Sequence, residues 1–273
     1  MNPAVNPKVA QLAAVMRMEI WKTFWGKGSW WVSLLALGPV AVCGGHFLTA
    51  RGGCDLVEDT AIFAGIFQLY YLRLLIYFGC AGIFSNLFRG EMLEKTLHYY
   101  LLVPAGRDVL VAGKYLAGLV TAVLLFAGST AASFLLIRAH FGEIFQEFLF
   151  KGPGLAHLGA YLLVATLATI GYGSVFTLMG LHFRNPMGPA AFVMVWEGLN
   201  PFLPTFLKKF SVIFYLKALT PVDVPEVGPL SILISDSTAP RPDLAVIGLL
   251  IVCVFLLWAA ARSARKLEIN YGE

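Results

Sequence analysis

Six long stretches with almost no charged residues dominate this sequence. Four contain no Asp, Glu, Lys or Arg, and they cover residues 28–50, 115–137, 152–183 and 244–261. Two more contain one charge each: residues 61–88 include Arg73, and residues 185–207 include Glu197. A helix that crosses the hydrocarbon core of a bilayer needs about 20 mostly apolar residues. The pattern therefore predicts an all-α integral membrane protein with six transmembrane helices.

The composition excludes most other classes of protein. Apolar residues make up 58% of the chain and charged residues only 13%, against about 45–50% and about 25% in soluble domains. The mean hydropathy is +0.75. These values exclude a disordered chain, a basic nucleic-acid binder and an ordinary cytosolic enzyme.

The predicted organisation is one transmembrane domain over residues 1–273. It consists of an interfacial helix at 8–27, spans at about 28–50, 61–88, 115–137, 155–182, 186–205 and 244–262, an inner loop at 89–114, and an outer segment with a re-entrant helix at 206–243. With the N-terminus inside, the inner segments hold twelve Lys and Arg residues and the outer segments seven. This excess predicts that both termini are cytoplasmic.

Two amphipathic segments flank the spans. Residues 8–25 have apolar side chains at helical spacing, with Glu19 and Lys22 expected on the polar face, and tryptophans crowd the start of the first span. Tryptophan prefers the headgroup level of a bilayer, so this helix is predicted to lie in the inner interface. Residues 206–219 show a similar pattern and predict one short helix.

No catalytic or metal-binding motif is present. The sequence contains no phosphate-binding loop, HExxH or GxSxG pattern, and its four cysteines show no zinc-site spacing. The histidines fall in different segments and are interpreted as structural: His46, His98, His140, His157 and His182. We therefore expect no catalytic residue, cofactor or metal in this chain.

Two ionisable residues inside predicted spans are candidates for a substrate path. A charge at the centre of a membrane helix costs at least about 2.5–3.5 kcal/mol, so such residues normally face a partner or a wet cavity. Arg73 and Glu197 lie at similar predicted depth. Tyr70 and Tyr77 share a helix face with Arg73, and Asn200 shares one with Glu197. These five side chains either line a translocation path, or Arg73 and Glu197 form an ion pair that only fixes helix register, or backbone carbonyls satisfy Arg73.

The inner loop carries a pattern of acidic, leucine, proline and arginine residues. Its members are Glu91, Glu94, Lys95, Thr96, Leu97, Leu101, Pro104 and Arg107, and a Gly113–Lys114 pair follows. This run resembles the E-x-E-x-G-T-L-x-x-L-L-x-x-P-x-x-R pattern, followed by G-K-x-L, of permease subunits of type-2 ABC transporters. It departs from that pattern at Lys95, where glycine is usual, and in the spacing of its two acids, which is one residue longer.

The resemblance implies a type-2 ABC exporter-like fold and separate roles for the permease and an ATPase subunit. The permease binds no ATP and is no enzyme. A separate cytoplasmic ABC ATPase holds ATP and Mg²⁺ and contacts the inner loop through a coupling helix near residues 91–102. A second permease chain, identical or related, forms a dimer around a path lined by the second and fifth spans, which hold Arg73 and Glu197. The expected location is the plasma (inner) membrane, and the expected activity is export.

Two other classes of function remain open. A membrane enzyme acting on lipid would need acidic or histidine residues clustered at one membrane edge, and the inner acids here are scattered with no D-x-x-D pair. A non-transporting assembly or structural subunit of a larger membrane complex would have no need of a coupling-type helix. No feature of the sequence favours nucleic acid as a partner.

Overall fold

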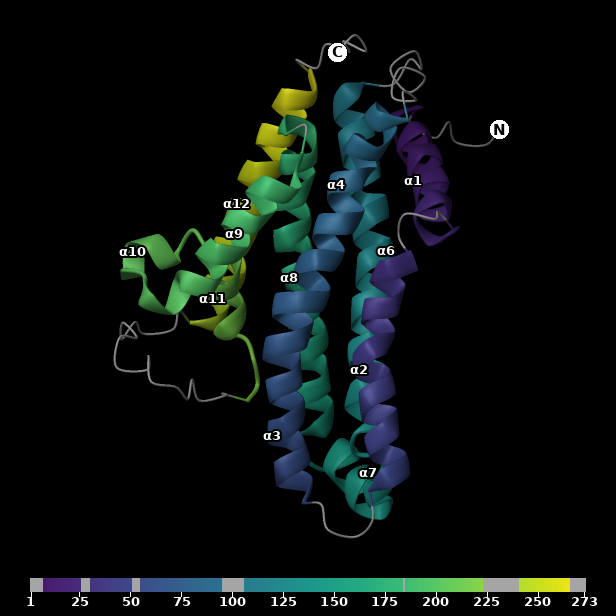
Figure 1. The fold of residues 1–273 in the computed structure, drawn as a ribbon, viewed down its shortest axis with the longest axis vertical. Coiled ribbons are helices and arrows are strands. Elements are labelled where there is room, and N and C mark those ends of the chain that lie inside the picture. The colour runs from purple at the N-terminus through teal and green to yellow at the C-terminus, as the bar shows by residue number, and fades with distance from the viewer. Residues whose placement is uncertain are drawn as a thin grey trace.

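The computed structural model describes residues 7–25, 30–50, 55–94, 106–183, 185–222 and 241–265. Every regular element within these ranges is a helix. Five helices are long and apolar enough to cross a membrane, and they form an elongated bundle (Figure 1). They are α2 (Trp30–Thr49), the continuous helix Leu56–Leu93, α6 (Arg107–Leu136), α8 (Gly154–His182) and α12 (Pro242–Arg265). The described part of the chain is therefore all-helical, and its five long apolar helices indicate a membrane-embedded protein.

The second of these helices changes its winding along its length. It begins as α3 (Leu56–Ile66), passes through a π-helical stretch, η1 (Phe67–Ile76), and ends as α4 (Tyr77–Leu93). A π-helix of this length is rare, and such segments occur frequently at functional sites. The candidate path residues Arg73 and Tyr70 lie in this stretch.

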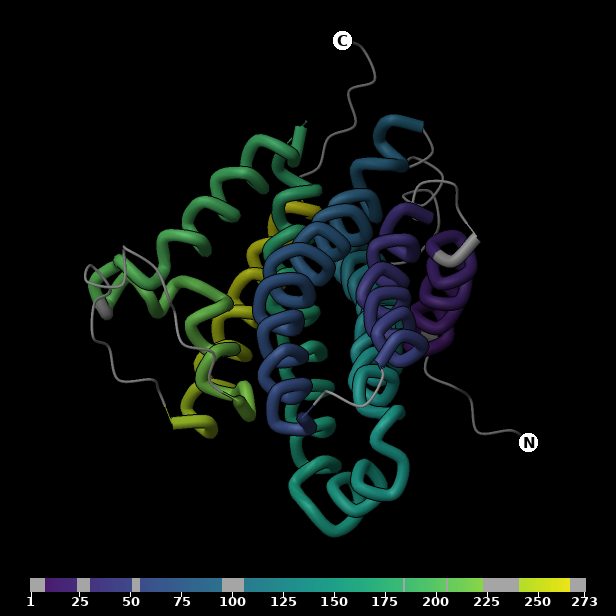
Figure 2. The backbone as a smooth tube through the Cα atoms, turned by 60° about the horizontal axis from the view of Figure 1, so that its bottom comes forward, coloured from purple at the N-terminus to yellow at the C-terminus, as the bar shows by residue number. Residues whose placement is uncertain are grey.

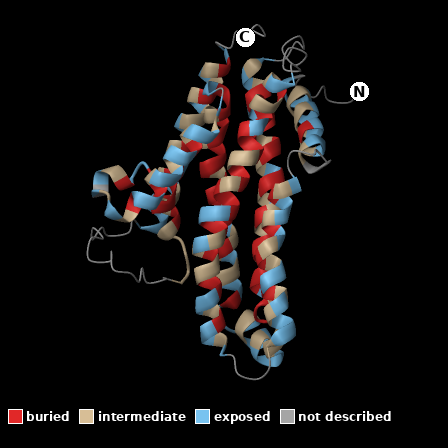
Figure 3. Ribbon diagram, viewed as in Figure 1, coloured by how far each residue is buried: buried red, intermediate tan, exposed pale blue. Residues whose placement is uncertain are grey.

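The bundle exposes many large apolar side chains and buries several polar ones. Figure 3 shows how buried and exposed residues alternate along its helices. On α12, Ile251, Val254 and Phe255 are each more than 60% exposed. Inside, Tyr71 bonds to the hydroxyls of Ser129 and Ser133, and Ser129 also donates to the Ala36 carbonyl. Hydroxyl bonds between helices, beneath an apolar surface, are typical of helices packed in a bilayer.

The fifth predicted span, residues 186–205, does not form a membrane-length helix. It forms α9 (Met187–Leu199), then a 3₁₀ turn, η3 (Asn200–Phe202), and α10 (Thr205–Lys208). The 13 residues of α9 extend only about 20 Å, against a hydrocarbon core of about 30 Å. Pro201 and Pro204 cannot donate the backbone bonds that would continue the helix. Together with α11 (Val212–Lys217), these elements form an arm beside the bundle (Figure 2).

The single helix predicted for residues 206–219 is also divided. The chain turns between α10 and α11, and Ser211 precedes the first turn of α11. Because of this break, Phe206 and Phe210 are exposed whereas Lys208 is buried, the reverse of the expected faces. α11 packs against α8 and α12. The rest of the predicted outer segment, residues 223–240, lies outside the described residues.

The N-terminal helix is confirmed as a helix, α1 (Pro7–Trp25), and it packs along α6. Its predicted polar face is wrong at Glu19, which is only 2% exposed. Its location at a membrane interface stays a prediction. At the other end of the bundle, a 3₁₀ turn, η2 (Ala139–Phe141), and α7 (Glu143–Phe150) join α6 to α8 (Figure 1).

Small residues allow α4 and α8 to pack closely, and at Gly180 the backbone of α4 lies directly against α8. A Cβ atom at this position would lie 2.7 Å from the Ser85 carbonyl oxygen and 3.0 Å from the Ser85 Cα atom. Because backbone atoms cannot rotate away, Gly180→Ala must separate the two helices. We expect it to lower the free energy of unfolding by about 1–3 kcal/mol, the usual cost of overpacking.

The matched control is Gly128→Ala on α6, where an added Cβ meets no atom within 4 Å. This change should be neutral or slightly stabilising, because alanine is the better helix former. Thermal unfolding of both variants in mild detergent measures the difference. Equal midpoints for the two variants would contradict the close contact at Gly180.

Candidate functional site

A pocket of about 230 Å³ lies where the long π-containing helix meets α8, α9 and α11. Three of the five predicted path residues line it. The full lining is Arg73, Leu74, Tyr77, Tyr172, Met194, Glu197, Gly198 and Ile213. The fold therefore brings the charged residues of the second and fifth predicted spans to one cavity, although they are far apart in the sequence.

Arg73 supplies the only cationic side chain of this pocket lining. It projects from η1 and is exposed on the protein surface. Its guanidinium carries five N–H donors in a planar fork, which suits carboxylate and phosphate groups. An anionic or strongly polar group that enters the pocket would meet this side chain.

Glu197 is satisfied within the protein rather than by Arg73. Its carboxylate accepts bonds from the backbone N–H groups of Val212, at 2.9 Å, and Ile213, at 3.1 Å, and from the Ser211 hydroxyl. These donors form the first turn of α11, where a negative charge is favourable. Among the residues that the structure describes, no ion pair joins Glu197 to Arg73.

Two tyrosines complete the polar wall. Tyr77 donates to the Ala190 carbonyl of α9, and its ring packs edge-on against Tyr172 of α8. Tyr172 and Glu197 both line the pocket. The sequence analysis missed Tyr172, because nothing in the uncharged stretch 152–183 distinguishes one buried tyrosine from another.

The other two predicted path residues lie outside this pocket. Tyr70 donates to the Leu35 carbonyl of α2 at 2.9 Å, so it joins two helices. Asn200 is buried at the end of α9, 4% exposed, and is not part of the pocket lining.

A second polar centre lies at the end of the bundle that holds α1. The Lys114 ammonium contacts Glu19 at 2.6 Å, Glu91 at 2.7 Å and the Leu87 carbonyl at 3.0 Å. Lys114, Glu19 and Glu91 are each at most 2% exposed. The half-exposed Lys22 adds a contact to Glu91 at 3.3 Å. This buried ion cluster joins α1, α4 and α6.

The predicted coupling residues are distributed around this cluster. Glu91 is buried within it, so this side chain is not part of an exposed docking surface. Glu94 is exposed at the end of α4. Arg107 donates to the carbonyls of Ala264 and Arg265 at the C-terminal end of α12. The remaining predicted residues lie outside the described part of the chain: Lys95, Thr96, Leu97, Leu101 and Pro104.

The first turn of α6 is fixed to the last turn of α12 by a further contact. Asp108 and Arg265 form a two-point ion pair, Nε to Oδ1 at 2.9 Å and Nη2 to Oδ2 at 2.5 Å. Together with the Arg107 bonds, this pair links the segment that follows the inner loop to α12. The start of α6, which follows the inner loop, is therefore held against the end of α12.

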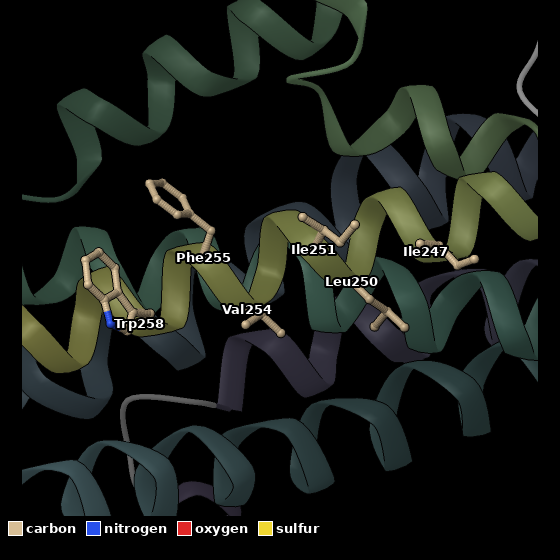
Figure 4. Close-up of a pocket in the computed structure, with 6 residues that line it drawn as sticks. All are labelled: Ile247, Leu250, Ile251, Val254, Phe255 and Trp258. Carbon is tan, nitrogen blue, oxygen red and sulfur yellow. The ribbon is translucent and has the colours of Figure 1, made fainter.

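The outer face of α12 carries a shallow apolar hollow of about 560 Å³ (Figure 4). All six lining side chains come from this one helix: Ile247, Leu250, Ile251, Val254, Phe255 and Trp258. It contains no polar group that would orient a substrate, so its chemistry suits lipid chains or another apolar helix.

One group of side chains could hold a metal ion. His46, Asp59 and His140 bring one ligand atom each to within 4.8 Å of one another. The sequence analysis interpreted these histidines as structural, because their separation along the chain hides the cluster. They belong to the end of the bundle opposite α1.

No protein-family model matches this sequence, and no curated protein matches it.

Proposed function

We propose that this chain is the permease subunit of a type-2 ABC transporter that exports its substrate. A separate cytoplasmic ATPase, which holds ATP and Mg²⁺, would drive it. The observation that carries the proposal is the buried ion cluster. Glu91 precedes the segment that resembles a coupling helix and Lys114 follows it, and the Lys114 ammonium contacts both Glu91 and Glu19.

This cluster connects the two ends of the inner loop to α1, α4 and α6. Because Glu91 and Lys114 bond at 2.7 Å, the two ends of the loop are held together. Glu19 adds α1 to the same unit, and the Arg107 and Asp108 contacts add α12. A force applied to the loop by a closing ATPase would therefore move four helices together, as a coupling element requires.

The pocket supports a second chain around a substrate path. Arg73 lies on a membrane-length helix yet is exposed on the single chain. Contact with lipid tails would cost at least about 2.5–3.5 kcal/mol, so a polar path or a neighbouring protein is needed to cover it. A second permease chain, in a homodimer or heterodimer, would be the neighbouring protein and would form the other wall of the polar path.

The arrangement of the helix ends supports the proposed topology. α1 and the C-terminal end of α12 lie at the same end of the bundle (Figure 1). The excess of Lys and Arg in the inner segments favours the cytoplasm for this end. We propose the plasma (inner) membrane as the location.

Charge reversal at Glu94 tests the coupling surface. Glu94→Lys replaces an anion at the proposed ATPase contact by a cation. The loss of a favourable charge contact, or a new repulsion, should weaken binding of the ATPase about tenfold or more. The tagged chain is purified from membranes in mild detergent, and the retained ATPase is quantified against the wild type. The chain itself should insert normally.

The matched control is Glu147→Lys, the same reversal on α7 at the opposite end of the bundle, where Glu147 is 70% exposed. It should retain as much ATPase as the wild type. Equal retention by Glu94→Lys and Glu147→Lys would remove the assignment of this loop.

A further inference from the structure

Three side chains from different segments converge at the end of the bundle opposite α1. His46 lies in the last turn of α2, Asp59 in the first turn of α3, and His140 in η2. The Asp59 Oδ2 atom is 3.3 Å from His46 Nε2 and 3.7 Å from His140 Nε2. Both imidazoles therefore face the same carboxylate oxygen.

These separations match those of ligands on a tetrahedral metal ion. With metal–nitrogen and metal–oxygen distances of about 2.0–2.1 Å, neighbouring ligand atoms on such an ion lie about 3.3–3.4 Å apart. Two of the three separations here are close to that value, and all are within 4.8 Å.

The ring nitrogens of His140 in this cluster are available to bind a ligand. His140 is only 13% exposed, and neither of its ring nitrogens has a hydrogen-bond partner in the described structure. Buried polar atoms normally have partners, because a missing bond is costly. A metal ion would satisfy one of these nitrogens.

The cationic side chain of Arg138 does not form an ion pair with the Asp59 carboxylate. Arg138 is buried beside Asp59, but it donates to the Phe134 carbonyl at 2.9 Å and to the Thr60 hydroxyl at 3.5 Å. Within the described ranges, no ion pair joins Arg138 to Asp59. The buried Asp59 charge, 1% exposed, is therefore faced only by the two imidazoles at contact distance.

We propose that His46, Asp59 and His140 form a binding site for one divalent transition-metal ion, for which Zn²⁺ is the best match. Two imidazole nitrogens and one carboxylate oxygen are a ligand set that Zn²⁺ accepts, and three protein ligands leave a fourth position open to water. The His46 side chain is 31% exposed, so an ion has a way in from the surface. The bound ion would hold α2, α3 and the α6–α8 connection together. The proposal is independent of the transport function.

Direct metal binding tests this site. The chain is purified with a tag that contains no histidine, stripped with EDTA, and titrated with Zn²⁺ alone, with bound metal quantified by mass spectrometry. We expect about one tightly bound ion per chain, and His140→Ala should weaken that binding by at least about tenfold. Because the His46 side chain is more exposed than that of His140, 31% against 13%, His46→Ala serves as a second variant that is easier to accommodate.

The matched control is His182→Ala, at the exposed C-terminal end of α8, which should bind Zn²⁺ as the wild type does. Co²⁺ substitution gives a second readout, since visible absorption of tetrahedral Co²⁺ should appear in the wild type and disappear in His46→Ala. Zn²⁺ binding that is absent in the wild type, or equal in the wild type and both cluster variants, would overturn the proposal. The cluster would then be a hydrogen-bonded contact between Asp59 and His46, with His140 packed beside it.

Discussion

Replacement of Lys114 by methionine is expected to lower the free energy of unfolding by about 3–5 kcal/mol. Lys114 is fully buried and uses its ammonium group on Glu19, Glu91 and the Leu87 carbonyl. Methionine fills similar space but leaves two carboxylates buried without this cation. Removing one partner of a buried ion pair is much more damaging than removing an exposed pair, because the remaining charge cannot reach water.

The control for this change is Lys151→Met. Lys151 is 79% exposed and pairs with Glu147 at 3.4 Å within one helical turn. Such exposed pairs contribute only about 0.3–0.5 kcal/mol. Unfolding of both variants in detergent, followed by tryptophan fluorescence, gives the comparison. A Lys114→Met variant as stable as Lys151→Met would mean that the buried ion cluster does not hold α1, α4 and α6 together.

A compensated variant separates lost charge from lost packing. Changing Glu19 and Glu91 to glutamine in the Lys114→Met background removes the three buried charges of the cluster. Lys22 stays, but it is half exposed. Replacing a whole buried ion cluster by neutral groups is often close to neutral. This triple variant should therefore recover much of the stability that Lys114→Met loses.

The second large effect is expected at Glu197. Glu197→Ala leaves the N–H groups of Val212 and Ile213 and the hydroxyl of Ser211 without their acceptor in a buried site. Each unsatisfied buried group costs about 1–3 kcal/mol, so we expect a total loss of about 2–4 kcal/mol after partial relaxation. The arm formed by α9, α10 and α11 should loosen first.

The same experiment decides the relation between Glu197 and Arg73. Arg73→Ala should change the stability of the purified chain little, because its side chain is exposed. The double variant should then equal the sum of the single changes within about 0.5 kcal/mol. A double variant that is clearly less damaged than this sum would show an ion pair in solution. Transport, in contrast, should depend on both residues.

The helices of the bundle could be predicted from the sequence because their signal is local. A stretch of some 20 uncharged residues has one stable solution in a bilayer, and five of the six predicted spans form membrane-length helices. The prediction for the fifth span, residues 186–205, was wrong in length, also for a local reason. Pro201 and Pro204 interrupt the helix, and the Glu197 carboxylate instead starts a new helix at Val212.

The polar sites could be predicted only in part because they depend on distant partners. Arg73 and Glu197 were recognisable as charges inside apolar stretches, and the fold does bring them to one pocket. Glu19 was assigned to a polar face because its partner, Lys114, belongs to another helix 95 residues away. His46 and His140 were separated in the same way. Neither spacing nor composition indicates such contacts; only the packing of the helices does.

Purification of the wild-type chain from its native membranes in mild detergent tests the central claim most directly. The account predicts that an ATPase accompanies the chain in stoichiometric amount and that the complex hydrolyses ATP in a vanadate-sensitive manner. A chain that is isolated alone, or with partners that do not hydrolyse ATP, would contradict the transporter assignment and favour an assembly subunit of a larger membrane complex.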